Sequence, residues 1–379
     1  MKKTVPVFLA AILIAGCAVL LWNTRGAEEQ WTPGRPLGKD RIKVGVLYLS
    51  DVEHATGGYS YAHDLGIKEM QRELGLRDDQ IIRKSNVSDL DKGRAEMAMR
   101  ECVASGANVI IATSDGYAEV CEKLSAIYPG VVFAQIDSLK RNGSNLTNFF
   151  GRVYQARYLS GIVAGFRTET NKIGYVGAMG RDNSQVTSGL DAFAMGVERA
   201  NKDAVILVRV THRWYDPAGE MDAARRLIEE SCDVIAQHCD TPNPQVAANV
   251  ADVWGVGYNT DMSEDAPGTT ITSVVWNWGV YYTYLVRSVI DGTFTTDPYF
   301  GDIGEGMVAI TPLDERIAPP GAMEEVALAR SEIESGRNGI FDGVMMTNDG
   351  AFIGTEGTTL SDDVIRASIN WYYRNIVER

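Results

Sequence analysis

The chain has 379 residues, of which 45% are hydrophobic, and its formal net charge is −14 at pH 7. This length exceeds one typical core and predicts two lobes of ordinary domain size. The acidic balance excludes nucleic acid and an anionic membrane surface as main partners, because both would repel the protein. Small molecules and other proteins remain.

The first 17 residues are typical of a secretory signal. Two lysines precede an apolar run that ends at Cys17 in the sequence IAGC, which resembles the cleavage box of bacterial lipoproteins. Cys17 would then be lipidated, become the mature N-terminus and tether the protein to a membrane outside the cytoplasm. The alternative is an uncleaved anchor, because the charge-free stretch continues to Trp22 and is just long enough to span a bilayer.

Residues 18–40 are rich in charge, glycine and proline, which predicts a tether. Four further cysteines follow in the body of the chain: Cys102, Cys121, Cys232 and Cys239. In an oxidising compartment they allow one or two disulfides. Buried free thiols are at least as compatible with the sequence, because a domain of this size does not need covalent links.

From Arg41 onward, short apolar runs alternate with amphipathic stretches of helical length. A first series has strands in RIKVGVLYLS, IIRKSNV, NVIIAT and VVFAQID, with helices in DLGIKEMQREL and over about 117–128. A second series has strands in KIGYVGA, VILVRVT and DVIAQH, with helices over about 186–200 and 218–230. This alternation predicts an α/β fold with parallel sheets built from βαβ units.

The two series resemble each other, since ANVIIATSDGYAEV and CDVIAQHCDTPNPQV each present a strand, a polar turn and a new helix. This weak repeat has the size of a duplicated lobe. The run SVVWNW is followed by another helix, which suggests that the chain crosses back to the first lobe late in the sequence. We therefore expect an N-terminal lobe of residues 41–152 plus about 278–300, and a C-terminal lobe of 153–277 plus about 301–379.

Ligands of open parallel sheets bind beyond the carboxyl ends of the strands. The loops after VGVLYL, VIIAT, VILVRV, VIAQH, WGVGYN and TSVV should therefore line one cleft between the lobes.

Catalytic and metal-binding motifs are scarce. The sequence has no G-x-x-x-x-G-K-[ST] loop, no H-E-x-x-H motif, no C-x-x-C pair and four histidines in all. His212 with Asp216, or His238 with Cys232, Cys239 and Asp240, match no known ligand spacing. The sequence predicts a binding protein with no catalytic residues, no metal and no cofactor.

The stretch DVEHATGGYSYAHDLGIKEM places two glycines before Tyr59 and Tyr61, with Asp64 in the first turn of a helix. Here the chain resembles the basic membrane protein family of ABC-transporter solute-binding lipoproteins, which includes purine-nucleoside receptors. The likeness extends from about Val44 to Glu378 through YQARYLSGIVAG, KIGYVGAMG, WYDPAGEMDAARRLIEESCDVIAQHCDTP, GVGYNTDM and TSVVWNWGVYY.

The resemblance implies a type I periplasmic binding protein fold, in which two Rossmann-like lobes are joined by a hinge and enclose a central ligand cleft. It also implies capture of a purine base or nucleoside, hinge closure, and delivery by a monomeric lipoprotein to the permease subunits of an ABC importer. The alternatives are a binding protein for another flat heterocycle such as a flavin, a nucleoside-acting enzyme, and a sensor or adhesion lipoprotein on the same fold.

By the same resemblance, the aromatic side chains that sandwich the ligand correspond to Tyr59 and Trp214. The candidate polar groups for the edge of the ring are Asp115, His238, Asp240, Asn259 and Asp261. Further candidates are Tyr61 and Asp64, which follow Tyr59 closely, and Gly116, which follows Asp115. Exocyclic amines and ring N–H groups need such acceptors. The two tyrosines could instead pack the start of their helix, and Asp115 could cap one. We expect Asp216 to cap the helix that begins at Pro217.

One position departs from the nucleoside-binding branch, where a lysine commonly follows TSVV and holds the sugar. Here the residue is Trp276. Added aromatic surface suits a bare base, so we expect Trp276 to contact the ligand and rank a nucleobase above a nucleoside. Trp278, Tyr281 and Tyr282 start the next helix, where we expect them to pack.

Overall fold

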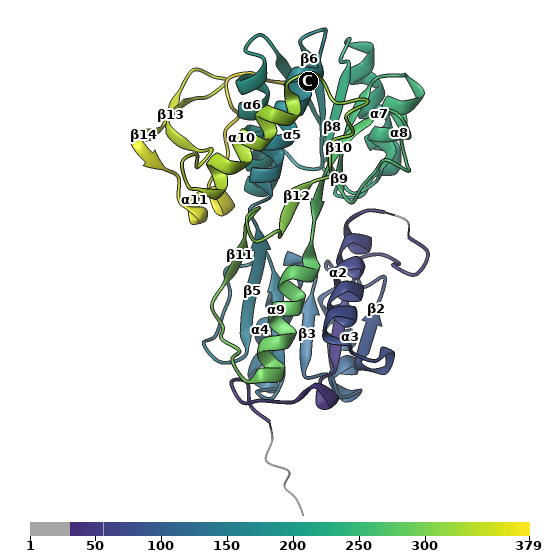
Figure 1. Cartoon of the computed structure of the whole chain (residues 1–379). Coiled ribbons are helices and arrows are strands. Elements are labelled where there is room, and N and C mark those ends of the chain that lie inside the picture. Colours follow the sequence, from purple (N-terminus) through teal and green to yellow (C-terminus); the bar gives the residue numbers. More distant parts are fainter. Residues whose placement is uncertain (1–30, 56) are drawn as a thin grey trace, which may run out of the picture.

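The computed structural model describes residues 31–55 and 57–379. Two α/β lobes lie end to end and are joined by three chain crossings (Figure 1). The expected signal segment, the lipidated Cys17 and tether residues 18–30 lie outside the described residues. Within the described part, no helix combines the length and the apolar character needed to cross a membrane.

The first lobe contains a six-stranded parallel sheet with the order β2-β1-β3-β4-β5-β11. Its strands are β1 (Val44–Leu47), β2 (Ile81–Lys84), β3 (Val109–Ala112), β4 (Val132–Ile136), β5 (Leu146–Gly151) and β11 (Tyr299–Gly301). Its helices are α2 (Tyr59–Leu74), α3 (Lys92–Ala104), α4 (Ala118–Ile127) and α9 (Trp278–Asp291), with short 3-10 turns η1 (Lys39–Arg41), η2 (Asp78–Gln80) and η3 (Asp115–Tyr117).

Helices cover both faces of this sheet because its strands carry apolar side chains on both sides. Ile111 of β3 belongs to the same buried cluster as Ile67 of α2. The next residue back, Ile110, belongs to a second cluster together with Met99 of α3. A strand buried on both faces produces the continuous apolar runs seen in the sequence.

The second lobe contains a seven-stranded sheet with the order β15-β7-β6-β8-β9-β10-β12, in which only β12 runs antiparallel to its neighbour. Its strands are β6 (Lys172–Gly177), β7 (Val205–Val210), β8 (Val234–His238), β9 (Trp254–Asn259), β10 (Thr270–Trp276), β12 (Val308–Ile310) and β15 (Ile376–Glu378). Its helices are α5 (Val153–Arg167), α6 (Ser184–Ala200), α7 (Pro217–Glu229), α8 (Asn243–Val250), α10 (Ala322–Glu334) and α11 (Asp362–Ala367).

Five strands of each lobe follow the same spatial order, β2-β1-β3-β4-β5 in the first and β7-β6-β8-β9-β10 in the second. This common order agrees with the weak internal repeat in the sequence. In such doubly wound sheets the ligand crevice lies beyond the carboxyl ends of the strands. The two sheets therefore direct equivalent loops toward the region between the lobes.

The chain crosses between lobes where β5 leads into α5, where β10 leads into α9, and where β11 leads into β12. As a result, α9 and β11 lie in the first lobe although they follow most of the second lobe in sequence (Figure 1). Short crossings of this kind permit rigid-body rotation of one lobe against the other.

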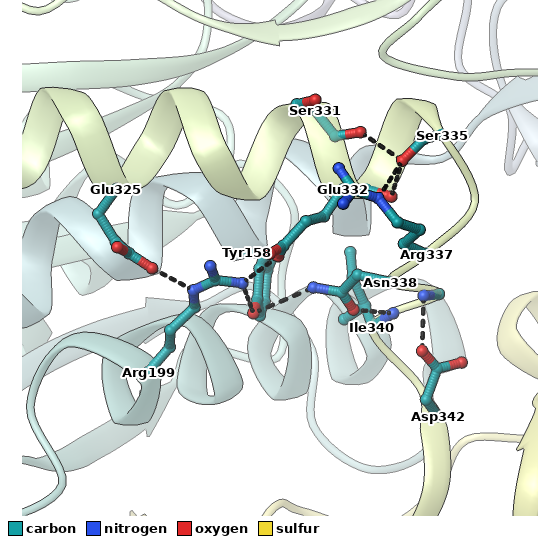
Figure 2. Close-up of polar contacts among 11 residues, drawn as sticks. Tyr158, Arg199, Glu325, Ser331, Glu332, Ser335, Arg337, Asn338, Ile340 and Asp342 are labelled. Carbon is teal, nitrogen blue, oxygen red and sulfur yellow. Dashed lines mark hydrogen bonds and ion pairs between the residues drawn. The ribbon is translucent and has the colours of Figure 1, made fainter.

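A charged network holds α10 on α5 and α6 (Figure 2). The guanidinium of Arg199 in α6 lies 2.6 Å from a carboxylate oxygen of Glu325 and 2.6 Å from one of Glu332, both on α10. The hydroxyl of Tyr158 in α5 accepts hydrogen bonds from Arg199 and from the amide of Asn338, each at 3.3 Å. The contact with Arg199 lowers the pKa of Glu332. Charge-assisted hydrogen bonds thus fix the start of the C-terminal segment.

Beyond α10 the segment forms an antiparallel hairpin of β13 (Asp342–Met346) and β14 (Phe352–Thr359), followed by α11 and β15. Helix α11 lies at the edge of the second lobe that faces the first lobe, near β11 (Figure 1). The guanidinium of Arg366 in α11 is 4.9 Å from the ring centre of Phe300 in β11. The C-terminal segment therefore contacts both lobes.

The four cysteines of the described chain are buried free thiols, so no disulfide joins them. Burial raises the pKa of Cys102 to about 11 and that of Cys232 to about 12. These thiols act as small apolar side chains in the two lobes.

Candidate ligand-binding site

A cavity of about 80 Å³ lies between the lobes at the carboxyl ends of both sets of strands. Its walls combine rings and carboxyl groups. The aromatic residues are Tyr59, Phe150, Trp214 and Tyr258, and the acidic residues are Asp89, Asp115, Asp137 and Asp240. The remaining lining residues are Leu49, Ser114, Ile136, Asn183 and Gln185.

Tyr59 and Trp214, the two expected stacking residues, line this cavity from opposite lobes, and so do the predicted Asp115 and Asp240. Tyr59 is the first residue of α2, and its ring meets the edge of the His63 ring at a centroid distance of 4.5 Å. It therefore packs against its own helix and faces the cavity at the same time.

At Gly58, the residue before Tyr59, the backbones of the two lobes lie in close contact. Gly58 has φ of 89°, and a Cβ placed on it would lie 2.7 Å from the backbone oxygen of Asp240 in the other lobe. No side chain fits this contact or favours this backbone conformation. Gly58 therefore serves both the turn and the approach of the second lobe.

The turn after β7 positions Trp214. Its carbonyl accepts a hydrogen bond from the backbone N–H of Asp240 at 3.0 Å, which ties two cavity residues of this lobe together. The expected cap is confirmed: the carboxylate of Asp216 accepts from the N–H of Gly219 at 3.1 Å, and Pro217 is the first residue of α7. The cap fixes where α7 starts and thus where Trp214 points.

Asp115 lies in a small acidic group in the first lobe. The hydroxyl of Ser114 donates to Asp89 at 2.5 Å and lies 3.4 Å from Asp115. Ser114, rather than Asp115, caps the 3-10 turn by accepting from the N–H of Gly116. The Asp115 carboxylate is therefore left to face the cavity.

Two of the cavity carboxyls are buried enough to hold protons near neutral pH. Burial raises the pKa of Asp240 to about 7, with Glu220 adding to the rise and the amide of Asn259 opposing it. Burial also raises the pKa of Asp137 to about 7, against the effect of Arg366. Asp137 has φ of 49° at the end of β4, a conformation that is uncommon outside glycine and is found at binding sites.

The other predicted residues do not line the cavity: Tyr61, Asp64, Gly116, His238, Asn259, Asp261 and Trp276.

In the first lobe, Asp64 is bound by other side chains. It accepts hydrogen bonds from Arg83 at 2.7 Å and Tyr48 at 2.9 Å and forms an ion pair with Lys68 at 2.8 Å. The ring of Tyr61 lies 5.8 Å from the same lysine ammonium. The carbonyl of Gly116 accepts from Lys92. These contacts give each group a structural partner.

In the second lobe, His238 and Asn259 lie behind the wall. His238 is fully buried, with its ring 4.6 Å from that of Tyr258, and burial lowers its pKa well below the usual value, so it is neutral. The amide of Asn259 donates to Asp240 at 3.4 Å. Asp261 is exposed and accepts from the N–H of Ser263 at 2.9 Å.

Trp276 is 4% exposed and lies behind two wall residues instead of in the cavity. Its indole N–H donates to the hydroxyl of Tyr258 at 3.2 Å, and its ring is stacked on Trp278 at 4.5 Å. The expected direct contact with the ligand is therefore corrected to a contact with Tyr258. Trp278, Tyr281 and Tyr282 pack in the core, as expected.

Sequence reasoning missed several lining residues, above all Asp89, Asp137, Phe150, Gln185 and Tyr258. Asp89 follows β2, Asp137 follows β4, and Phe150 lies near the end of β5. The rule that selected the loops after other strands applies equally to these strand ends. Asp89 and Asp137 could therefore have been predicted from their positions after strands. Phe150 could not, because whether its side chain faces the cavity depends on how β5 meets the hinge.

The cavity suits a flat ligand with several N–H donors, because rings supply stacking surface and carboxyl groups supply acceptors. Within residues 31–55 and 57–379, no group of three or more His, Cys, Asp or Glu side chains could hold a metal ion.

Comparisons with known proteins agree with this geometry. The chain is 28% identical over 346 residues to a purine-binding protein of Brucella abortus (strain 2308), covering 91% of this chain and 96% of that protein. It is 30% identical over 285 residues to a Haloferax volcanii protein provisionally named ABC transporter glucose-binding protein TsgA13, covering 75% of this chain and 70% of that protein.

Among solved structures, the ABC transporter solute-binding protein of Conexibacter woesei DSM 14684 superposes with a TM-score of 0.66 at 20% identity, over 78% of this chain and 97% of that one. The type I periplasmic binding protein fold that the resemblance implied is thereby confirmed. The sequence profile described as ABC transporter substrate-binding protein PnrA-like matches residues 42–318. This chain is a member of that family of PnrA-like substrate-binding proteins.

Proposed function

We propose that the protein captures a purine base or nucleoside between its lobes and delivers it to the permease of an ABC importer. The observation that carries the proposal is one interlobe cavity in which Tyr59 and Trp214, from different lobes, occur together with Asp115 and Asp240. A purine offers two flat faces and several N–H donors on its edge, which match these rings and acceptors.

Binding would close the lobes. A ligand that first rests on one lobe gains its second ring contact only when the other lobe arrives, so it stabilises the closed form. The close approach of Gly58 to Asp240 marks the surfaces that would meet. The permease would recognise this closed form, and lipidated Cys17 would keep the protein at the membrane outside the cytoplasm.

The relative from Brucella abortus is named for purine binding, which supports the ligand class. The Haloferax volcanii relative is named for glucose binding, so glucose is the natural comparison ligand. We favour the purine because the relative named for purine binding matches 91% of this chain, against 75% for the relative named for glucose binding, and because the cavity wall carries four aromatic rings that suit a flat heterocycle.

The test is calorimetric titration and thermal unfolding with adenine, guanine, hypoxanthine and their nucleosides, alongside glucose and riboflavin. We expect at least one purine or purine nucleoside to bind and raise Tm, and we expect no response to glucose or riboflavin. Binding of glucose or riboflavin with no response to any purine at millimolar concentration would overturn the proposal. Conversion of the purine during long incubation would indicate an enzyme instead.

Variants connect binding to the cavity. Tyr59→Ala and Trp214→Ala should each weaken purine affinity by about tenfold or more, since stacking of a base is worth about 1–3 kcal/mol. Tyr215→Ala is the matched control, because Tyr215 is adjacent to Trp214 yet 67% exposed. Equal losses in Tyr215→Ala and Trp214→Ala would contradict the assigned stacking role.

A further inference from the structure

Arg157, near the start of α5, places a positive charge in the core of the second lobe. Its side chain is completely buried, yet no carboxylate of the described chain forms an ion pair with it. One guanidinium nitrogen, Nη1, donates to the backbone carbonyl of Gln237 at 2.6 Å. The other two, Nε and Nη2, have no hydrogen-bond partner. Buried charges in proteins are usually paired, so this guanidinium needs an explanation.

The guanidinium lies behind one residue of the ligand-cavity wall. Its central carbon is 4.1 Å from the ring centre of Tyr258 in β9, which lines the cavity. A cation over the face of a desolvated aromatic ring is attracted by the electrons of that ring. The ring of His238 meets that of Tyr258 at 4.6 Å but stays neutral, because burial and the Arg157 charge both lower the pKa of the imidazole.

The arginine is closely packed on the side of α6. A Cβ placed on Gly189 of α6 would lie 3.6 Å from Cγ of Arg157 and 3.2 Å from the His238 ring. The carbonyl that Arg157 binds belongs to Gln237 in β8, three residues before Asp240 of the cavity. Arg157 therefore contacts the ends of both β8 and β9, from which this lobe builds its part of the wall.

The charge of Arg157 opposes folding. Replacing buried charged groups by apolar groups of similar size often leaves stability unchanged or raises it. Nitrogens without a partner add to the penalty, because their hydrogen bonds to water are lost on burial and not replaced. A residue that only stabilised the lobe would therefore be served better by an apolar side chain. The contacts that Arg157 does make lead to Tyr258 and toward Asp240, so its position points to ligand capture.

We propose that Arg157 is a positioning residue for ligand capture, which holds the Tyr258 ring in the cavity wall although its charge destabilises the folded lobe. This inference rests on the proposed function and adds to it a residue that does not touch the ligand.

The test compares Arg157→Met with wild type in the full chain. Calorimetric titration uses adenine, guanine, hypoxanthine and their nucleosides, and thermal unfolding is measured without ligand. Affinity for the purines that bind wild type should fall by about tenfold, because the ring loses the charge that orients it. Tm without ligand should equal or exceed that of wild type, because an unpaired buried charge is gone. A merely structural residue would instead lower Tm.

A double-mutant cycle tests whether Arg157 acts through the ring of Tyr258. Tyr258→Leu should itself weaken purine binding, because a wall residue loses its ring. Adding Arg157→Met to Tyr258→Leu should then change the affinity by less than about twofold. Independent effects would multiply, and multiplied losses in the double variant would overturn the proposal.

Arg157→Gln provides a second route to the same result, because its amide keeps a donor for the Gln237 carbonyl and removes the charge. It should weaken purine binding as Arg157→Met does. Arg167→Met is the matched control. Arg167 lies in the same helix with its guanidinium 3.4 Å from the ring centre of Trp254, but Trp254 begins β9, away from the cavity end of that strand. This variant should leave purine affinity within about twofold.

The outcomes separate the two proposals. If no purine binds wild type, the proposed function itself fails. If a purine binds wild type, Arg157→Met and Arg157→Gln equally well, the positioning role is overturned while purine capture stands. The role is also overturned if both variants fail to fold or have a clearly lower Tm than wild type, because Arg157 would then be a structural residue.

Discussion

The indole N–H of Trp276 donates a hydrogen bond to the hydroxyl of Tyr258 at 3.2 Å, while the same indole lies 5.1 Å from the ring of Phe150. Tyr258 belongs to the second lobe and Phe150 to the first, and both line the ligand cavity. Trp276 is the last residue of β10, where the chain crosses between lobes. It therefore connects one wall residue of each lobe at the hinge.

Trp276→Phe keeps an apolar ring but removes the bond to Tyr258. A hydrogen bond of this kind contributes about 0.5–1.5 kcal/mol to folding, so we expect the free energy of unfolding to fall by about that amount. Purine affinity should fall by no more than about tenfold, because Tyr258 stays in the wall but loses one contact that positions it. Trp276→Lys would bury an ammonium group in the same place and should lower Tm far more. Calorimetry and thermal unfolding measure both effects, and a lysine variant as stable as wild type would contradict the buried position.

Gly58→Ala tests the approach of the lobes. The added Cβ would lie 2.7 Å from the backbone oxygen of Asp240, at a φ of 89° that alanine avoids. We expect purine affinity to fall by about tenfold or more and ligand-induced compaction in small-angle scattering to decrease. Gly57→Ala is the control, because its nearest neighbour would be the Thr260 hydroxyl at an ordinary 3.5 Å. Similar behaviour of the two variants would argue against a role for this contact.

Asp240→Asn should change stability with pH. Since burial raises the pKa of Asp240 to about 7, the folded protein holds this proton more tightly than the unfolded chain does. The carboxyl therefore lowers the free energy of unfolding as pH rises from about 4 to about 7, and the loss persists above that. The Asn variant should match wild type near pH 4 and exceed it by about 1–3 kcal/mol at pH 8.

Thermal unfolding across this pH range is the measurement, with Asp261→Asn as control because Asp261 is exposed and does not line the cavity. A gain that is the same at every pH would show that ionisation of Asp240 is not its cause. The same substitution should weaken purine binding, since an acceptor facing the ligand is lost.

Asp64→Ala separates stability from binding. Its carboxylate is 2% exposed and holds Arg83 and Lys68, so removal leaves charges without their partner. Breaking such a pair costs about 3–5 kcal/mol when it is buried, and somewhat less here because Arg83 is partly exposed. We expect a clear fall in Tm with purine affinity of the folded protein within about twofold. A large loss of purine affinity in the folded variant would show that Asp64 takes part in ligand binding.

The thiols of the body should be unreactive in the folded state. Burial raises the pKa of Cys102 to about 11, and that of Cys121 is raised further. In the full chain with Cys17→Ser, we expect Ellman's reagent to label no thiol rapidly in buffer and all four in denaturant without reductant. Fewer than four thiols in denaturant would reveal a disulfide.

Much of the architecture followed from local pattern. The continuous apolar runs, such as VIIA in β3, predict strands buried on both faces, and their alternation with helices predicts parallel sheets. Tyr59 and Trp214 were identified by resemblance of short motifs, and they lie where loops of both lobes converge. Apolar runs and short motifs consist of residues close together in sequence, so they can be recognised in one amino-acid sequence without a structure.

Tertiary structure decided which neighbouring side chains face the ligand. Trp276 and Tyr258 are 18 positions apart, and only the hinge geometry places the tyrosine in the wall and the tryptophan behind it. Arg366 and Asp137 are separated by most of the chain and meet because α11 returns to the lobe boundary. The sequence by itself determined two α/β lobes and the strand-end loops between them, because the spacing of apolar residues that distinguishes strands from helices is a local property. The composition of the cavity was decided by how the crossings orient one lobe against the other, which no local pattern encodes.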